Sequence, residues 1–410
     1  MNTVNLPFDV LHAIISSLDD KGTALAVSLT CRTLRGLAIR RLLSILPINL
    51  KDQETVHALH KFLFANESAR IQSLRKLNIS IRSVDKPYSA EETVQCLVDI
   101  LKHATRLEWL ALCTFADDGL FDDFPQVLDA ICELSSLWEL VVDGDWSSPV
   151  QTILRRVRSP LKVLHIRPNG IHLPEQTFWI DPSHHESLLS QRLAFSLEEL
   201  HMEGAALWYP LGYKGVQFPG VRSVFLGYHG GPQRMETFLH MFPALNGTFD
   251  TGDLEFDEGA LLKANMAEQR RVRALNKQSQ EIRTWKYLDR VIGDTHALYM
   301  LALACSVRHL VVKQVCGHRK EQVADILRDT QPTCLNILIR LSHGLRIFED
   351  LFPPEATPVL THLVLVVFYE NFDTHVGNLN PCCHGDAHEI QWIALLVRHR
   401  RCIPVLMFFQ

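Results

Sequence analysis

The sequence lacks an excess of basic charge, long apolar runs and a basic region ahead of its first apolar segment. In 410 residues, 41 Lys and Arg stand against 46 Asp and Glu, which gives a net charge of −5 with 20 histidines counted as neutral. Such a balance offers no electrostatic footprint for nucleic acid. No apolar run approaches the ~18 residues of a membrane span. We therefore expect neither nucleic-acid nor membrane binding, and no secretory signal.

The ten cysteines form no even-spaced framework of the kind that disulfide-rich secreted domains show. Most of them have apolar neighbours, as buried free thiols do. They stand at positions 31, 96, 113, 132, 305, 316, 334, 382, 383 and 402. We expect a reducing compartment, and hence a cytoplasmic or nuclear protein.

Catalytic motifs are also missing: there is no phosphate loop, dinucleotide fingerprint, H-E-x-x-H or G-x-S-x-G. Cys382-Cys383-His384 with His388 is the densest group of metal-ligand types, but adjacent cysteines do not have the C-x₂₋₄-C spacing of a zinc site. His184-His185-Glu186 is typical of a surface loop. We predict no catalytic residue, no metal, no cofactor and no enzyme. The alternative is a hydrolase-like or transferase enzyme, which requires a deep pocket lined by histidine and acid.

The stretch from Leu6 to Leu46 carries apolar residues at helical spacing. Val10, Leu11, Ile14, Ile15 and Leu18 follow the i, i+3, i+4, i+7 pattern of one helix face; the pattern breaks at residues 19–22 and resumes until Pro47. This predicts three short helices. A unit of about 40 residues buries little surface by itself, so it needs either the rest of the chain or a partner.

The residues of this stretch resemble an F-box, the motif by which substrate receptors dock on the Skp-type adaptor of cullin-RING ubiquitin ligases. The resemblance lies in Leu6-Pro7-x-Asp9-Val10-Leu11-x-x-Ile14-x-x-x-Leu18, followed by Leu25, Ser28-Leu29-Thr30-Cys31-Arg32 and Leu34-Arg35. It implies that the side chains facing the adaptor are Leu6, Pro7, Val10, Ile14 and Leu18, with help from Cys31 and Leu34.

A pattern L-x-x-L-x-L recurs along the rest of the chain, as in a leucine-rich repeat, where a turn leads into a short strand. It begins at Leu74, Leu107, Leu137, Leu161, Leu197, Val221, Val307, Cys334 and Leu360. Successive starts are 24–36 residues apart, except for one interval of 86 residues. We expect two degenerate repeats inside that interval, around Leu245–Phe249 and Leu288–Ile292. Helices are predicted after Pro47 and between strands, at Glu54–Phe64, Ser89–His103, Asp122–Glu133, Met235–His240, Glu321–Arg328 and Ile390–Arg398.

Polar residues alternate with the apolar ones in these strands. A doubly wound α/β domain, the alternative for alternating strands and helices, has strands buried on both faces that read as continuous apolar runs. One exposed sheet face therefore favours a solenoid: a curved parallel sheet with helices on its outer side. The alternate positions that we expect to face a target protein are Lys76, Asn78, Trp109, Glu139, Asp143, His165, Arg167, Glu199, His201, His309 and Lys313.

The segment 261–290 is the compositional outlier, with eight Lys and Arg against three Asp and Glu. A solvated helix or long loop is the favoured interpretation, and a basic docking patch for an acidic partner is the alternative. The overlapping stretch Trp285–Val312 resembles a segment of fungal F-box proteins that bear irregular repeats.

Together these features predict an α/β chain with an F-box at 1–47, a helical linker at 48–69 and an irregular leucine-rich-repeat domain at 70–410. The implied function is a non-enzymatic substrate receptor, bound through a Skp-type adaptor to a cullin-RING ligase and holding an unknown target protein. The alternative is a repeat scaffold whose N-terminal helices only cap the solenoid, with no ligase attached. Exposure of Pro7, Ile14 and Leu18 separates the two.

Overall fold

The computed structural model describes residues 7–65, 70–81, 89–114, 119–144, 148–168, 191–203, 217–227, 234–252, 266–315, 319–340, 348 and 351–368. The chain forms two compact units. The first comprises Met1–Glu175 and Ser183–Glu198, and the second comprises Gln176–Pro182 and Glu199–Gln410.

The first unit begins with three helices, as the N-terminal periodicity predicts. They are α1 (Phe8–Ser16), α2 (Lys21–Thr30) and α3 (Arg32–Ile45). The unit continues with the strands β1 (Ile48–Leu50), β2 (Lys76–Ile79), β3 (Trp109–Thr114), β4 (Glu139–Gly144) and β5 (Val163–Pro168). Its other helices are α4 (Gln53–Phe64), the 3₁₀ turn η1 (Ile71–Ser73), α5 (Ala90–His103), α6 (Gly119–Asp123), α7 (Pro125–Glu133), α8 (Ser148–Arg156) and α9 (Gln191–Ser196).

The second unit contains the strands β6 (Glu199–Met202), β7 (Ser223–Leu226), β8 (Thr248–Asp250), β9 (Tyr287–Asp294), β10 (Ser306–Val315), β11 (Cys334–Arg340) and β12 (His362–Phe368). Its helices are α10 (Met235–Met241), α12 (Met266–Ile282), α13 (Thr295–Leu301) and α14 (Lys320–Thr330). The strands β8 and β9 lie where the two degenerate repeats were predicted, so the presence of a strand at each of these places is confirmed.

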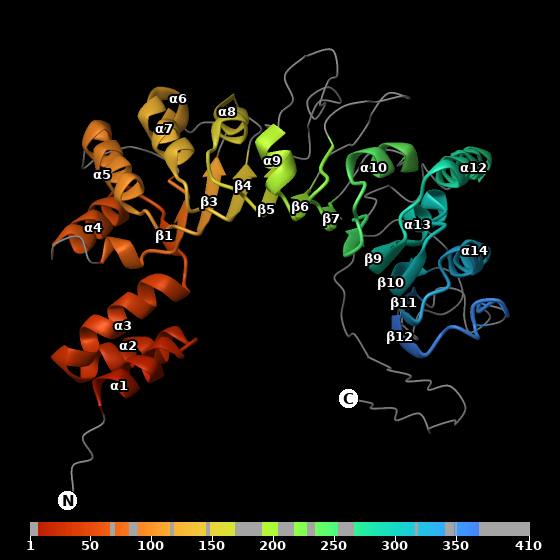
Figure 1. Cartoon of the computed structure of the whole chain (residues 1–410), viewed down its shortest axis with the longest axis horizontal. Coiled ribbons are helices and arrows are strands. Elements are labelled where there is room, and N and C mark those ends of the chain that lie inside the picture. Colours follow the sequence, from red (N-terminus) through yellow and green to blue (C-terminus); the bar gives the residue numbers. More distant parts are fainter. Residues whose placement is uncertain are drawn as a thin grey trace, which may run out of the picture. The chain divides into compact units, whose positions relative to one another are not determined.

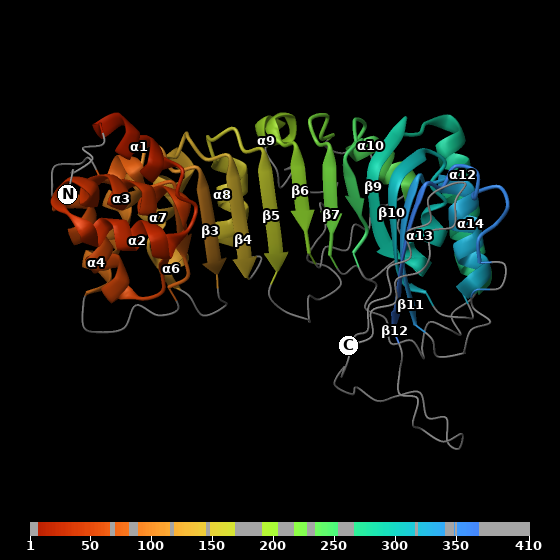
Figure 2. The ribbon, with the colours of Figure 1, turned by 90° about the horizontal axis from the view of Figure 1, so that it is seen from below.

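All strand pairs are parallel, and in each unit the strands lie side by side in chain order (Figure 2). In the first unit, α5, α7 and α8 lie on one side of β3, β4 and β5 (Figure 1). A doubly wound sheet reverses its strand order and carries helices on both faces. The observed order and one-sided helices exclude that alternative and are those expected for an α/β solenoid.

Alternate strand residues form the core because successive side chains of a strand point to opposite faces. Leu77, Leu110, Leu140 and Leu164 are in register on neighbouring strands, and each is 0% exposed. Strand β4 alternates half-buried and buried residues along its whole length. The buried side faces the helices and leaves the other face of the sheet accessible.

The region of the degenerate repeats is held by aromatic side chains in place of leucines. Phe249 of β8 packs edge-on against Phe238 of α10 and against Trp285, with ring centroids 5.3 and 5.5 Å apart. The indole Nε1 of Trp285 donates to the carbonyl of Phe242 at 2.8 Å. Edge-to-face aromatic pairs at this separation are favourable, which explains how the core continues where the leucine pattern fades.

The helices α8, α9 and α13 were not predicted, and three expected elements have another outcome. The segment 48–69 holds the expected helix, α4, but β1 precedes it and pairs with β2, so this segment belongs to the sheet. The helix expected at Asp122–Glu133 is two helices, because Pro125 cannot donate a backbone N–H and begins α7. The helix expected at Ile390–Arg398 lies outside the described residues.

Candidate functional site

The outer face of α1 exposes a stripe of apolar side chains. Pro7, Val10 and Ile14 share one side of the helix by their spacing, and Val10 and Ile14 are 41% and 48% exposed. The neighbouring Ile15 points inward and is 4% exposed. A contiguous group of exposed apolar side chains often marks a surface that binds another protein.

Helix α2 adds to this apolar surface. Leu25 and Leu29 are one turn apart and are 48% and 77% exposed, whereas Ala24 and Ser28 are buried. The helix begins at its N-cap Asp20, whose carboxylate accepts from the backbone N–H of Thr23 at 2.6 Å. That hydrogen bond lowers the pKa of Asp20. The buried small residues of α2 face α3, so the large ones face outward.

Helix α3 joins the three-helix segment to the repeats. The guanidinium of Arg41 donates to the carbonyl of Leu18 at 2.7 Å and to the carboxylate of Asp19 at 2.9 Å, which closes the turn after α1. The backbone N–H of Arg75 donates to the carbonyl of Leu43 at 3.2 Å, at the start of β2. The last turn of α3 therefore belongs to the repeat unit, while α1 and α2 keep an open face.

The residues predicted to face an adaptor fall into three groups. Pro7, Val10, Ile14 and Cys31 are exposed, Leu18 and Leu34 are half-buried, and Leu6 lies outside the described residues. The prediction omitted Phe8, which is 54% exposed, as well as Leu25 and Leu29. Leu25 and Leu29 stand inside the motif on which the resemblance rests, and their i, i+4 spacing could have identified them.

On the accessible sheet face of the first unit, polar side chains pair across strands. Asn78 donates through Nδ2 to Oδ1 of Asn49 on the neighbouring strand at 3.1 Å. The imidazole Nε2 of His165 lies 3.3 Å from a carboxylate oxygen of Glu139. Trp109 is half-buried and stands in register between Lys76 and Glu139. The face is thus a mixed-charge surface with one large aromatic side chain.

The accessible sheet face of the second unit has its own aromatic contact. The ring of His201 stacks on Phe225, with centroids 4.0 Å apart and an angle of 2° between planes, and its Nε2 lies 2.5 Å from the carboxylate of Glu199. His309 is in register with Arg290 on β9, and Lys313 with Asp294. Stacking on Phe225 and the contact with Glu199 restrain the His201 ring, which reduces the entropy that a bound partner must remove there.

All eleven residues predicted to face a target avoid the core. Arg167 is exposed and the other ten are half-buried. The structure brings them together as two groups, one on each unit: residues 76–167 on the first and residues 199–313 on the second. Phe225 was missed, although it occupies the same alternate position of its repeat as His201 does in the preceding one.

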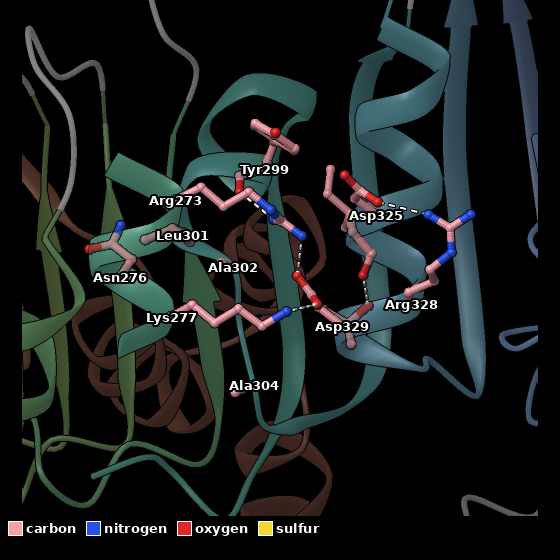
Figure 3. A network of polar contacts seen from close by, with 12 residues as sticks. Arg273, Asn276, Lys277, Tyr299, Leu301, Ala302, Ala304, Asp325, Arg328 and Asp329 are labelled. Carbon is pink, nitrogen blue, oxygen red and sulfur yellow. Dashed lines mark hydrogen bonds and ion pairs between the residues drawn. The ribbon is translucent and has the colours of Figure 1, made fainter. Parts of the chain in front are cut away.

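The basic segment 261–290 contains α12, and its buried side is polar (Figure 3). Asn276 donates to the carbonyl of Met300 at 2.8 Å and accepts from the backbone N–H of Met235 at 2.9 Å. The amide nitrogen of Gln280 donates to the carbonyls of Leu301 and Ala302, and its oxygen accepts from the backbone N–H of Ala304 at 2.8 Å.

These acceptors are the carbonyls at the C-terminal end of α13, which have no partner inside that helix. The helix ends where Ala302 takes a left-handed conformation with φ of 49°. Helix α12 supplies the missing donors from outside, so it caps α13 through its side chains. Buried polar groups must be paired in this way, because an unpaired one costs about 1–3 kcal/mol.

An ion pair extends the contact to α14. The guanidinium of Arg273 lies 2.5 Å from a carboxylate oxygen of Asp329 and 4.5 Å from the ring centre of Tyr299, and Lys277 reaches the other oxygen of Asp329 at 3.3 Å (Figure 3). The segment forms a helix with an exposed side, as the favoured interpretation expected, but the side that holds Asn276 and Gln280 is buried. Arg270, Arg283 and Lys286, by contrast, are exposed.

Within the described ranges, no group of three or more His, Cys, Asp or Glu side chains is placed to hold a metal ion. No helix in that part of the chain is both long and apolar enough to span a membrane. The groups Cys382–His388 and His184–Glu186 lie outside the described residues. The sequence matches no model of a known protein family and no curated protein.

We predict that Gln280→Ala destabilises the second unit by about 2–4 kcal/mol, because it leaves buried carbonyls and an N–H without partners. Hydrogen exchange of the α12 and α13 amides, followed by mass spectrometry, measures the loss of protection. Gln278→Ala is the matched control, since Gln278 is exposed on the same helix. Equal protection in both variants would contradict the capping role of α12.

The thiols should differ sharply in reactivity in the folded protein. Burial raises the pKa of Cys305 to about 11 and also raises that of Cys132, whereas Cys31 is exposed. A thiol that titrates near 11 instead of 9.0 has a roughly hundredfold lower thiolate fraction at neutral pH. Maleimide labelling with peptide mapping should modify Cys31 in the folded protein, and Cys132 and Cys305 only after unfolding. Modification of Cys305 before unfolding would show that the reagent reaches this thiol in the folded protein, which would contradict its burial.

Proposed function

We propose that this chain is the substrate receptor of a Skp–cullin–F-box ubiquitin ligase. Helices α1, α2 and α3 are the F-box that docks the Skp-type adaptor, and the parallel strands are an irregular leucine-rich-repeat solenoid that binds a target protein. The chain performs no bond chemistry. It holds the target near the ubiquitin-conjugating enzyme, so that proximity accelerates transfer by residues of other subunits.

The observation that carries this proposal is the open apolar face of α1 and α2. Val10, Ile14, Leu25 and Leu29 are each more than 40% exposed, although the helices bury Ile15 and Ala24 beside them. A cap on a solenoid turns such a face toward the repeats. Here the face is free, which supports a helix-in-groove contact with another protein.

The sheet faces support the second half of the proposal. Trp109 and the stacked pair His201 and Phe225 offer aromatic contacts of the kind that anchor interfaces, within polar surroundings. The polar residues around them include Lys76, Glu139, Arg167 and Glu199. Their mixed charge suits a protein target better than a uniformly charged ligand.

One observation favours the scaffold as a second candidate. The three-helix segment does contact the repeats, through the hydrogen bond from Arg75 to Leu43 and through α3 packed on η1. In a scaffold, the three helices would only cap the solenoid through that contact, and they would bind no adaptor. The two candidates differ in whether the free faces of α1 and α2 bind an adaptor.

Co-purification with a Skp-type adaptor tests the proposal. Val10→Asp/Ile14→Asp should weaken adaptor binding more than about tenfold, because burying a large apolar side chain contributes about 1.5–3 kcal/mol and each 1.4 kcal/mol is tenfold. Both side chains are already exposed, so the variant should stay folded.

Phe195→Asp is the matched control, since Phe195 is 67% exposed on α9, away from the three helices. It should bind the adaptor like the wild type. If the folded wild type captures no adaptor, the scaffold becomes the better account. If the control loses binding equally, the effect is not specific to α1.

Adaptor binding should also shield Cys31. This thiol is exposed between α2 and α3, among the residues assigned to the interface. Saturating adaptor should slow its maleimide labelling at least about tenfold, as burial of a thiol limits access to the reagent. Cys334 of the second unit is the internal reference and should label at an unchanged rate. Unchanged labelling of Cys31 in the complex would place the interface elsewhere.

A further inference from the structure

A cleft of about 200 Å³ lies in the first unit, where α1 and α3 meet the start of the repeats. Its walls come from α1, from α3, from η1 with the residues that follow it, and from the turn after α5. Four arginines and one histidine are among the residues that line it: Arg40, Arg41, Arg75, Arg106 and His12. No aspartate or glutamate is among the described residues that line it.

Two of the arginines are held in place by the protein. Arg41 donates to the carbonyl of Leu18 and pairs with Asp19, whose side chain is 92% exposed. Arg75 donates to the carbonyl of Arg106 at 3.0 Å and lies 3.3 Å from Glu108. Each is therefore fixed by a backbone contact and only partly neutralised by a carboxylate outside the cleft.

Arg40 and Arg106 differ from Arg41 and Arg75 in the partners of their guanidinium groups. Neither makes an ion pair or a side-chain hydrogen bond within the described part of the chain, although both belong to the wall of the cleft. Four arginines against the two carboxylates Asp19 and Glu108 leave an excess of two positive charges (4 − 2 = 2). Like charges repel, so gathering them at one cleft opposes folding unless an anion offsets them.

The geometry points to a binding site for a phosphate group in this cleft. A phosphomonoester carries about −1.5 to −2 charges at neutral pH and has three acceptor oxygens, and the guanidinium fork binds such oxygens in pairs. A carboxylate has only two oxygens and one charge. It would leave several donors without an acceptor among Arg41, Arg75 and the two arginines that have no ion pair within the described residues. The hydroxyls of Ser16 and Ser73 lie in the same wall and add hydrogen-bonding groups.

The cleft and the apolar stripe use different sides of α1. At about 100° per residue, His12, Ile15 and Ser16 lie on the side away from Pro7, Val10 and Ile14. A bound phosphate therefore leaves the stripe free. It would connect α3, the start of β2 and the turn after α5, and so stabilise the junction between the three helices and the repeats. This site does not depend on the proposed function.

Isothermal titration calorimetry of the full chain tests the site, with two phosphate sources as probes at constant ionic strength. Sodium pyrophosphate represents a soluble phosphate compound, and a short phosphoserine peptide represents a phosphorylated protein segment. The unphosphorylated peptide is the blank. Saturable binding of either phosphate probe is expected, and the tighter of the two identifies the source. Absence of binding by both would overturn the proposal.

Arg40→Gln/Arg106→Gln should weaken that binding at least about tenfold, because it removes the two guanidinium groups that make no ion pair or side-chain hydrogen bond with the described residues. These side chains are exposed, so the fold should persist, which circular dichroism checks. Arg270→Gln/Arg283→Gln is the control with the same change in charge, on exposed residues of the second unit. Equal weakening by the control would show general charge attraction and refute a site in the cleft.

Arg40→Lys/Arg106→Lys separates a shaped site from a charged surface. Lysine keeps the charge but lacks the fork of donors that matches two oxygens. We expect affinity between those of the wild type and the glutamine variant. Wild-type affinity in the lysine variant would contradict recognition by paired hydrogen bonds. Phosphate should also raise the melting temperature of the wild type, with a stabilisation that grows as the logarithm of the phosphate concentration above Kd.

Discussion

The burial of alternate strand residues, as in β2 and β4, is the constraint on which the rest of the first unit depends. Leu77, Leu110, Leu140 and Leu164 lie in register and exclude water completely. A slip of one residue in any strand would turn its apolar set toward solvent, so the register is strongly specified. The residues that face the core also determine which residues lie on the opposite face of the sheet, because successive side chains of a strand point to opposite faces. The accessible face that carries Trp109 is therefore a consequence of the leucine pattern.

Helix α12 shows how the stack continues where that pattern is weak. Its buried face is made of Gln269, Asn276 and Gln280 with only Val272 among apolar residues, so the hydrophobic effect contributes little there. The stabilisation comes from pairing the carbonyls that end α13, which would otherwise be buried without donors. Such contacts are directional, unlike apolar packing. They fix the position of α12 and thereby the outward direction of its exposed basic residues.

Of the three N-terminal helices, α3 is held against the repeats, whereas α1 and α2 expose apolar side chains. Helix α3 is tied to the repeats at Leu43 and to the turn after α1 through Arg41, whereas α1 and α2 keep apolar side chains in water. Exposure of this kind costs solubility unless a partner covers it. The same arrangement gathers arginines on the other side of α1. One small helical segment thus presents two surfaces of opposite character, one apolar and one cationic.

The sequence by itself determined the elements whose period is regular. The three N-terminal helices and the strands at the L-x-x-L-x-L positions follow from spacing, because spacing decides which side chains share a face. The strands β8 and β9 were predicted from the length of the 86-residue interval between two such positions. The residues of the accessible sheet face also follow from spacing. The strand β1 and the break at Pro125 were missed, since a strand of three residues and a break inside an apolar helix pattern leave weak signals.

Only the tertiary structure decided which polar residues are buried and which charges meet. Gln280 looks like a solvent residue in the sequence, and its partners lie 21–24 positions away, at the end of another helix. Arg40 and Arg106 stand 66 positions apart (106 − 40) and share a cleft because α3 packs against the first repeat. Local periodicity describes one element at a time. Hydrogen bonds and charge clusters form between elements, so their positions follow from packing.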